Sequence, residues 1–111
     1  MKDDNEEVLS VLQAGLQRLD LHLDNQESAS FDQSFHLTIK HLSARISDWL
    51  EHDFTHLTNL MYRIDIGEQA FNEALASQDP SKRLAELVLQ RELQKARTRI
   101  AYRKTKENEH Y

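Results

Sequence analysis

The sequence predicts an all-α protein, a bundle of four or five helices in which a helix over residues 80–104 is the longest or nearly so. Apolar residues recur at steps of three and four along most of the chain, which is the period of an amphipathic helix. The chain contains only 2 Gly and 1 Pro, so it has few positions for the tight turns of a sheet-rich domain. At 111 residues and 39% hydrophobic composition, one modest core can form without disulfides or metal. We therefore expect a single helical domain over residues 1–111, with residues 1–5 and 105–111 disordered.

The first predicted helix covers residues 6–23. Its apolar stripe consists of Val8, Leu9, Leu12, Leu16, Leu19 and Leu23. Gly15 lies inside this helix, weakens it modestly and leaves room for a neighbour to approach closely. The polar residues 24–30 form the first predicted loop, and Ser30 or Asp32 would cap the helix that follows.

Residues 31–65 carry one long apolar stripe that fits either one helix or two. The stripe consists of Phe35, Ile39, Leu42, Ile46, Leu50, Phe54, Leu57, Met61 and Ile64. A single helix of this length is unusual in a compact domain, where most helices have three or four turns. A break near residues 51–53, with Asp53 as the N-cap of a new helix, fits equally well because the stripe keeps its phase. Both versions stay open at this point.

Two boundaries divide the rest of the chain. Asp65 or Gly67 ends one helix and starts a short one over residues 68–77. Asp79 followed by Pro80 is the clearest boundary, because Asp is a good N-cap and Pro fits the first helical turn. The last helix is therefore expected to begin at Pro80.

The apolar residues of this last helix fall on two opposite faces. Leu84, Leu87 and Val88 form one face, and Ala85, Leu89, Leu93, Ala96 and Ile100 form the other. A helix with two apolar faces is covered on both, so it either passes through the middle of the bundle or meets a second subunit. The second version predicts a homodimer with Leu89, Leu93, Ala96 and Ile100 in the interface. Trp49, at the edge of the preceding stripe, belongs to the core rim or anchors an interface.

The charge is distributed unevenly along the chain. The net charge is −5, with 15 acidic and 5 basic residues over 1–79 and 4 acidic and 9 basic residues over 80–111. The basic segment, with Tyr102 among its cations, could bind the phosphates of a nucleic acid; the candidates are Arg97, Arg99, Arg103 and Lys104. The competing interpretation is structural. Cations near a helix C-terminus oppose the macrodipole, at about 0.3–1 kcal/mol each, and they can pair with the acidic part of the chain.

One pair of histidines has the spacing of metal ligands. His52 and His56 stand four residues apart, and on a helix they would share one face. Other possible ligands lie nearby in the sequence, namely His36, His41, Asp48 and Glu51. On a continuous helix, however, His52 points away from the apolar stripe, whereas ligands in a bundle project inward, and the expected Glu-x-x-His pairs are absent. We therefore favour solvated histidines over a metal site and predict no cofactor.

Catalytic motifs are missing from the sequence. The absence of Cys excludes thiol chemistry, disulfides and thiolate zinc sites. There is no Gly-x-Ser-x-Gly turn and no glycine-rich phosphate loop. The acidic N-terminus lacks the apolar stretch of a signal peptide, and no apolar run approaches the length that crosses a bilayer. We expect a cytoplasmic protein that is not an enzyme.

The segment Leu60-Met61-Tyr62-Arg63-Ile64-Asp65-Ile66 combines unlike residues at a predicted helix junction. Arg63 and Asp65 could form an ion pair there, and Tyr62 could close over the edge of the core. Together with Asp79-Pro80 and the long helix rich in Gln, Arg and Lys, the segment resembles small helical proteins of bacteria to which no function is attached. The resemblance covers residues 57–104 and implies a bacterial intracellular protein. It transfers no active site, cofactor or partner.

The sequence is compatible with three classes of function. The leading hypothesis is a non-enzymatic interaction or adaptor protein that binds itself as a homodimer or binds another protein. The first alternative is a nucleic-acid-associated protein that uses the basic C-terminal helix, and the second is a histidine-ligated metal-binding protein. No membrane partner is predicted.

Overall fold

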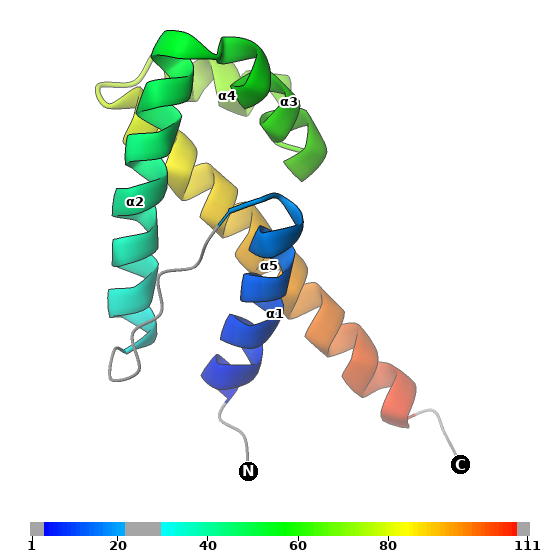
Figure 1. Ribbon diagram of the computed structural model, residues 1–111. Helices are drawn as coiled ribbons and strands as arrows, with labels where there is room; N and C mark the ends of the chain where they lie inside the picture. Colours follow the sequence, from blue (N-terminus) through cyan, green and yellow to red (C-terminus); the bar gives the residue numbers. More distant parts are fainter. Residues whose placement is uncertain (1–3, 22–29, 109–111) are drawn as a thin grey trace.

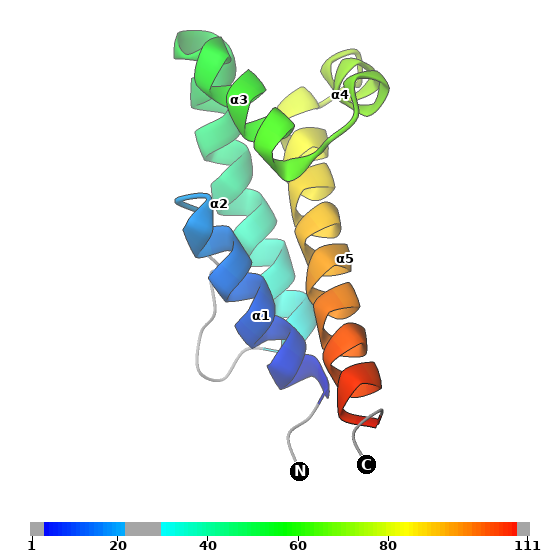
Figure 2. The ribbon, with the colours of Figure 1, turned by 90° about the vertical axis from the view of Figure 1, so that its right-hand side faces the viewer.

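Five helices and no strand make up residues 4–21 and 30–108, the part of the chain that the computed structural model describes. The helices are α1 (Asp4–Arg18), α2 (Phe31–His52), α3 (Phe54–Ile64), α4 (Glu68–Leu75) and α5 (Pro80–Asn108). The predicted all-α class and the long last helix are confirmed. Helices α1 and α2 run antiparallel to α5, and α3 and α4 lie at the end where α5 begins (Figure 1). The molecule measures 53 × 32 × 22 Å, and the start of α1 and the end of α5 lie at the opposite end from α3 and α4 (Figure 2).

Helix α1 ends at Arg18, five residues before the predicted end. Its last turn is closed by two backbone bonds, from Leu21 N–H to the Leu16 carbonyl at 2.8 Å and from Asp20 N–H to the Gln17 carbonyl at 3.0 Å. This is a Schellman motif, in which Asp20 takes the left-handed conformation at φ 59°. Leu16 and Leu21 are both buried, which supplies the hydrophobic contact of the motif. Past the end of the helix, Leu19 packs against the core and Leu21 is buried. Leu23, the last residue of the predicted stripe, lies outside the described residues.

The stretch 31–65 forms two helices that meet at Asp53, so the two-helix version is confirmed. Ser30 begins α2 with a capping box, in which its hydroxyl accepts from Gln33 N–H while the Gln33 side chain accepts from Ser30 N–H. Asp53 begins α3, because its Oδ1 accepts from His56 N–H at 3.1 Å. The predicted first loop, apart from Ser30, lies outside the described residues.

A second Schellman motif ends α3. Ile66 N–H donates to the Met61 carbonyl at 2.9 Å, Asp65 N–H donates to the Tyr62 carbonyl at 3.1 Å, and Asp65 has φ 68°. Gly67 then serves as the N-cap residue of α4, without a side-chain cap. This tight link lets α3 and α4 leave residues 65–67 in different directions (Figure 2).

Helix α5 begins as predicted, since Asp79 Oδ1 accepts from Lys82 N–H at 3.3 Å. It continues to Asn108, and α1 begins at Asp4, so the structure has helix at residues 4–5 and 105–108, where the sequence suggested disorder. The extension has a simple cause: the end of α5 is rich in Ala, Arg, Lys and Glu, which are strong helix formers, and adding residues to an existing helix costs little. Residues 1–3 and 109–111 lie outside the described part.

Both apolar faces of α5 are covered within the chain, because α5 packs against each of the other four helices. On one face Leu84 and Val88 are fully buried, and on the other Ala85 and Leu89 are fully buried. The two-sided pattern therefore has an internal explanation: α5 is the central helix around which the bundle is built.

Candidate functional site

A groove with a largely apolar lining lies between α3 and α4 and has a volume of about 780 Å³. Eleven residues line it, namely Phe54, Thr58, Met61, Tyr62, Asp65, Ile66, Gly67, Glu68, Phe71, Asn72 and Leu75. Its rim carries two aromatic side chains that are unusually exposed, Phe54 at 48% and Tyr62 at 87%. Met61 is buried, and Ile66, Phe71 and Leu75 are half-buried against the core. Apolar residues thus form the floor of the groove as well as part of its rim.

The local sequence explains why Phe54 reaches the surface. The break at Asp53 changes the direction of the helix, so the buried residues of α3 become Leu57, Leu60, Met61 and Ile64. Phe54 leaves the core stripe to which the sequence pattern assigned it. Its ring instead stacks on Phe71 of α4, with centroids 6.1 Å apart, and this contact bridges the two helices at one end of the groove.

Two contacts with α5 hold the other end. Lys95 Nζ donates to the Ile64 carbonyl at 2.8 Å, which satisfies an open carbonyl at the end of α3. Arg91 Nη2 lies 3.3 Å from Asp65 Oδ2. The Asp65 side chain is 83% exposed, so this ion pair is worth at most about 1 kcal/mol. These contacts fix the position of the α3–α4 link on the bundle.

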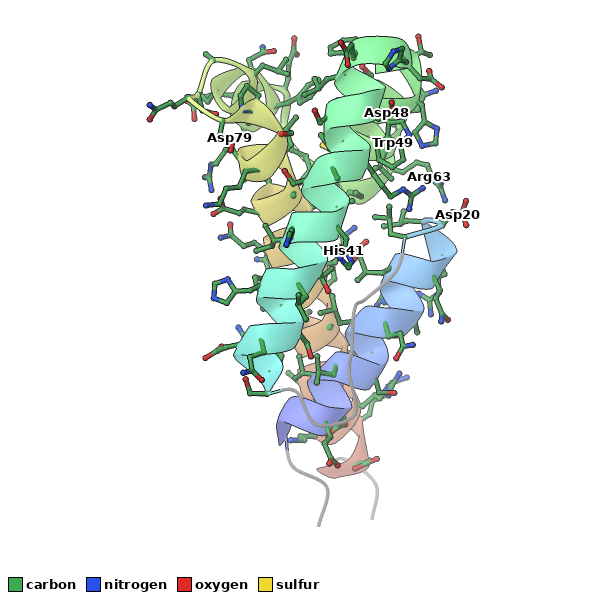
Figure 3. The ribbon with its side chains drawn as sticks, turned by 60° about the vertical axis from the view of Figure 1, so that its left-hand side comes forward. Asp20, His41, Asp48, Trp49, Arg63 and Asp79 are labelled. Carbon is green, nitrogen blue, oxygen red and sulfur yellow. The ribbon has the colours of Figure 1, made fainter. Side chains whose placement is uncertain are left out.

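Helix α1 is joined to α3 by a similar contact. Arg63 Nη2 donates to the Arg18 carbonyl at 3.1 Å, and Figure 3 shows Arg63 and Asp20 near each other at this joint. The predicted Arg63–Asp65 ion pair is therefore wrong: Arg63 serves the end of α1, and Asp65 faces Arg91. Tyr62 does not close over the core either, since it is the most exposed of the large hydrophobic residues described.

The charges along the groove have one sign. Among the described residues that line it, Asp65 and Glu68 are the charged ones, and both are acidic. They lie on the link and at the start of α4. Arg91 pairs with Asp65, so Glu68 is the lining acid without a cation partner among the described residues, and it makes this end of the groove negative. An apolar surface with an acidic end favours a ligand that is itself apolar and positively charged at the matching end.

The residues predicted to form an interface lie mostly inside the chain. Leu89 is fully buried, Ala96 is 1% exposed and Ile100 is 7% exposed, while Leu93 is half-buried. Trp49 is half-buried and covered on its rings: Arg45 lies 4.8 Å from its ring centroid and His56 lies 4.5 Å away. Arg45 also donates to the Asp20 carbonyl at 3.2 Å, so Trp49 belongs to the joint between α1 and α2 (Figure 3).

The histidine pair is divided by the helix break. His52 is the last residue of α2, where its Nδ1 lies 3.1 Å from Asp48 Oδ1. His56 lies in α3, and its ring contacts Trp49. Over residues 4–21 and 30–108, no three His, Cys, Asp or Glu side chains gather as a metal site would require.

The basic side chains of α5 differ in whether they have a partner within the described chain. Arg91 pairs with Asp65 and Lys95 holds the Ile64 carbonyl, as described above. The candidates Arg97, Arg99 and Arg103 are exposed, and no hydrogen bond or ion pair joins them to a described residue. Lys104 is exposed as well and has an interaction of its own. Pairing with the acidic part of the chain therefore accounts for Arg91 and leaves those three arginines unexplained.

Glu92 is a buried acid that the sequence pattern did not single out. Glu92 is 5% exposed and faces α1: a Cβ added to Gly15 would lie 3.6 Å from Glu92 Oε2 and 3.9 Å from Arg99 Nη1. These are ordinary contact distances, so no backbone approaches Gly15 closely enough to require glycine. A single carboxylate between two helices is not a catalytic constellation, which needs a second group in reach.

The groove also escaped prediction, although its signals are in the sequence. Phe71 and Leu75 stand one helical turn apart on α4, and Tyr62 does not fit the apolar stripe of α3. These signals point to a second apolar surface only once the break at Asp53 is known.

Comparisons with known proteins add no relative. No protein-family model, no curated protein sequence and no solved structure matches the chain. The resemblance to small bacterial helical proteins consequently stays a prediction. In the part of the chain that is described, no helix has both the length and the apolar character to cross a membrane.

Proposed function

We propose that this chain is a non-enzymatic interaction module that binds an amphipathic helix of another protein in the groove between α3 and α4. The observation that supports the proposal is the exposure of Phe54 and Tyr62 above an apolar floor. Large exposed apolar surfaces on small domains are characteristic of binding sites, and aromatic residues contribute much of the binding energy at protein interfaces.

The shape of the groove favours a helix as the occupant. Two short helices that diverge from a tight link and share an apolar floor resemble the sites at which an amphipathic helix inserts its apolar face. Phe54 and Tyr62 stand eight residues apart on α3, or about 12 Å along its axis. A partner helix would cover that distance with apolar residues spaced i, i+4 and i+7.

The charge of the groove defines the partner further. Asp65 and Glu68 are exposed at one end of the groove, and Arg91 touches only one oxygen of Asp65. A Lys or Arg near one end of the partner helix would face them, which would set the direction in which the helix binds. The proposed partner is thus an apolar helix with a basic end.

The test is a selection from a library of helical peptides, each about five turns long, against the full chain. Binders should share the i, i+4, i+7 apolar spacing with Lys or Arg at one end, and their backbone NMR shifts should map to residues 54–75. Tyr62→Asp should abolish binding without unfolding the protein, because Tyr62 is almost fully exposed. Tyr102→Asp is the matched control, since Tyr102 is 61% exposed at the far end of α5.

The proposal is overturned if selected peptides bind equally well to Tyr62→Asp, or if no helical peptide is enriched. Binding of small apolar molecules in place of peptides would also reject it. Sedimentation at micromolar concentration distinguishes a second copy as the partner: a dimer that Tyr62→Asp dissociates would make this surface a self-association site and reject the foreign helix. A cytoplasmic location, expected from the lack of Cys, is part of the same proposal.

A further inference from the structure

The end of α5 forms a second surface, far from the groove and of opposite charge. Every residue from Ala101 to Glu107 is exposed, as are Arg97, Thr98 and Arg99. This segment leaves the bundle as a helix that its neighbours do not cover, at the end of the molecule opposite α3 and α4 (Figures 1 and 2). Its charged residues are five cations and one acid, Glu107.

Four of these residues share one side of the helix. Arg99, Tyr102, Arg103 and Lys106 follow the spacing i, i+3, i+4 and i+7, which places them within about 100° of one another around the axis. Tyr102 is 61% exposed, and Lys106 Nζ lies 5.2 Å from its ring centroid. We call this set the basic stripe. It presents an aromatic ring surrounded by cations. No acidic side chain among the described residues forms an ion pair with these cations.

We propose that the basic stripe binds the phosphate backbone of a single-stranded nucleic acid, with a base stacked on Tyr102. Cations that follow a backbone and an aromatic ring that accepts any base are the two components of such binding without sequence preference. An anionic membrane fits less well, because a membrane-surface helix needs a large apolar face. Over residues 101–107 the apolar side chains are Ala101 and Tyr102 alone.

The acidic groups that oppose binding lie on α1 and on α5 itself. Glu6 and Glu7 lie in its first turns, at the same end of the molecule as the stripe (Figure 2). Glu92 also lies near Arg99, since both side chains reach toward Gly15. These acids lower the affinity, so the expected binding is weak and strongly dependent on salt.

The test measures fluorescence anisotropy of a labelled oligodeoxythymidine strand of about 20 nucleotides with the full chain. If about three cations contact phosphates, raising salt from about 50 to 200 mM should weaken binding about 20-fold. Arg103→Gln/Lys106→Gln should lower the affinity about tenfold and reduce the salt slope by about 1.4. Lys82→Gln/Arg83→Gln removes the same charge from the other end of α5 and should have little effect.

Two further variants test the mechanism. Tyr102→Ala should weaken binding about fivefold or more, and Tyr102→Phe should not, because the ring and not the hydroxyl carries the stacking. Glu6→Gln/Glu7→Gln should strengthen binding. All these residues are exposed except Glu7, which is half-buried, and unchanged circular dichroism verifies the fold.

Three results would overturn the proposal. One is no binding at about 50 mM salt, and another is an equal loss in the two matched double variants. The third is competition by phosphatidylserine vesicles that depends on the same residues, which would indicate a membrane surface. Tyr62→Asp should leave oligonucleotide binding intact. A negative result in the oligonucleotide assay is therefore distinguishable from a negative result in the peptide-binding assay.

Discussion

The two ends of α5 have opposite surroundings. The first half is enclosed by α2, α3 and α4, and it carries Leu84, Val88 and Leu89 with no exposure. The last three turns carry exposed cations, and Ile100 is the last residue that packs into the interior. One continuous helix therefore serves as core at one end and as surface at the other. The two proposed binding sites follow this division, with the groove beside the enclosed half and the basic stripe on the exposed end.

The largest expected effect lies in the enclosed half. Leu89→Ala should lower the free energy of unfolding by about 2–5 kcal/mol, because it leaves a cavity in a fully buried position. Tyr102→Ala, on the exposed end of the same helix, should change it by less than about 0.5 kcal/mol. Urea denaturation followed by circular dichroism measures both variants. Similar losses in the two would contradict the division of α5.

The second effect concerns the helix break that exposes Phe54. Asp53→Ala removes the side-chain cap of α3 and should destabilise the protein by about 1 kcal/mol. It should also weaken peptide binding in the groove, because the cap sets the direction of α3. Asp53→Asn, which can accept the same hydrogen bond, is the control in both measurements. A fall in stability with unchanged peptide affinity would show that the groove does not depend on this cap.

The third effect is a difference in stability between glycine substitutions in the two Schellman motifs. Asp20 and Asp65 both occupy the left-handed region, where a residue without Cβ has no steric cost. Asp20→Gly should therefore stabilise the protein by about 0.5–1 kcal/mol. Asp65→Gly should stabilise it less, since it also removes the contact with Arg91. Thermal unfolding of the two variants measures the difference, and an equal or larger gain at Asp65 would contradict a stabilising contribution from the ion pair.

The smallest effect on stability is expected from truncation. A chain that ends at Ala101 loses Tyr102, Arg103 and Lys106, all exposed, so its free energy of unfolding should change by less than about 0.5 kcal/mol. Binding of the single-stranded oligonucleotide should be lost, whereas peptide binding in the groove should remain. Denaturation and the two binding assays on one sample test all three expectations. A large loss of stability would mean that the end of α5 is part of the core.

Sequence periodicity alone was sufficient for the helices and most of their boundaries. The cap residue Asp79 was predicted correctly, and Ser30 was one of two candidates beside Asp32, because cap hydrogen bonds are made within three residues along the chain. The two faces of α5 were also read correctly, but two explanations remained. Whether Leu89 meets α1, α2 or a second subunit depends on contacts between residues far apart in sequence, which periodicity does not contain.

The candidate sites depended more on tertiary structure. Phe54 fits the core stripe in the sequence and is nevertheless half exposed, because a single cap at Asp53 redirects the helix that carries it. The three arginines Arg97, Arg99 and Arg103 were candidates from the start. Their lack of an internal partner among the described residues became visible only when the acidic side chains had been placed.

By itself the sequence determined the helical class, the caps and the separation of acidic from basic residues, since these depend on neighbours within one or two helical turns. The tertiary structure decided which apolar residues remain at the surface and which cations have no partner among the described residues. Both outcomes depend on how helices distant in sequence pack together, and small changes of direction at Asp53 and Asp65 control that packing.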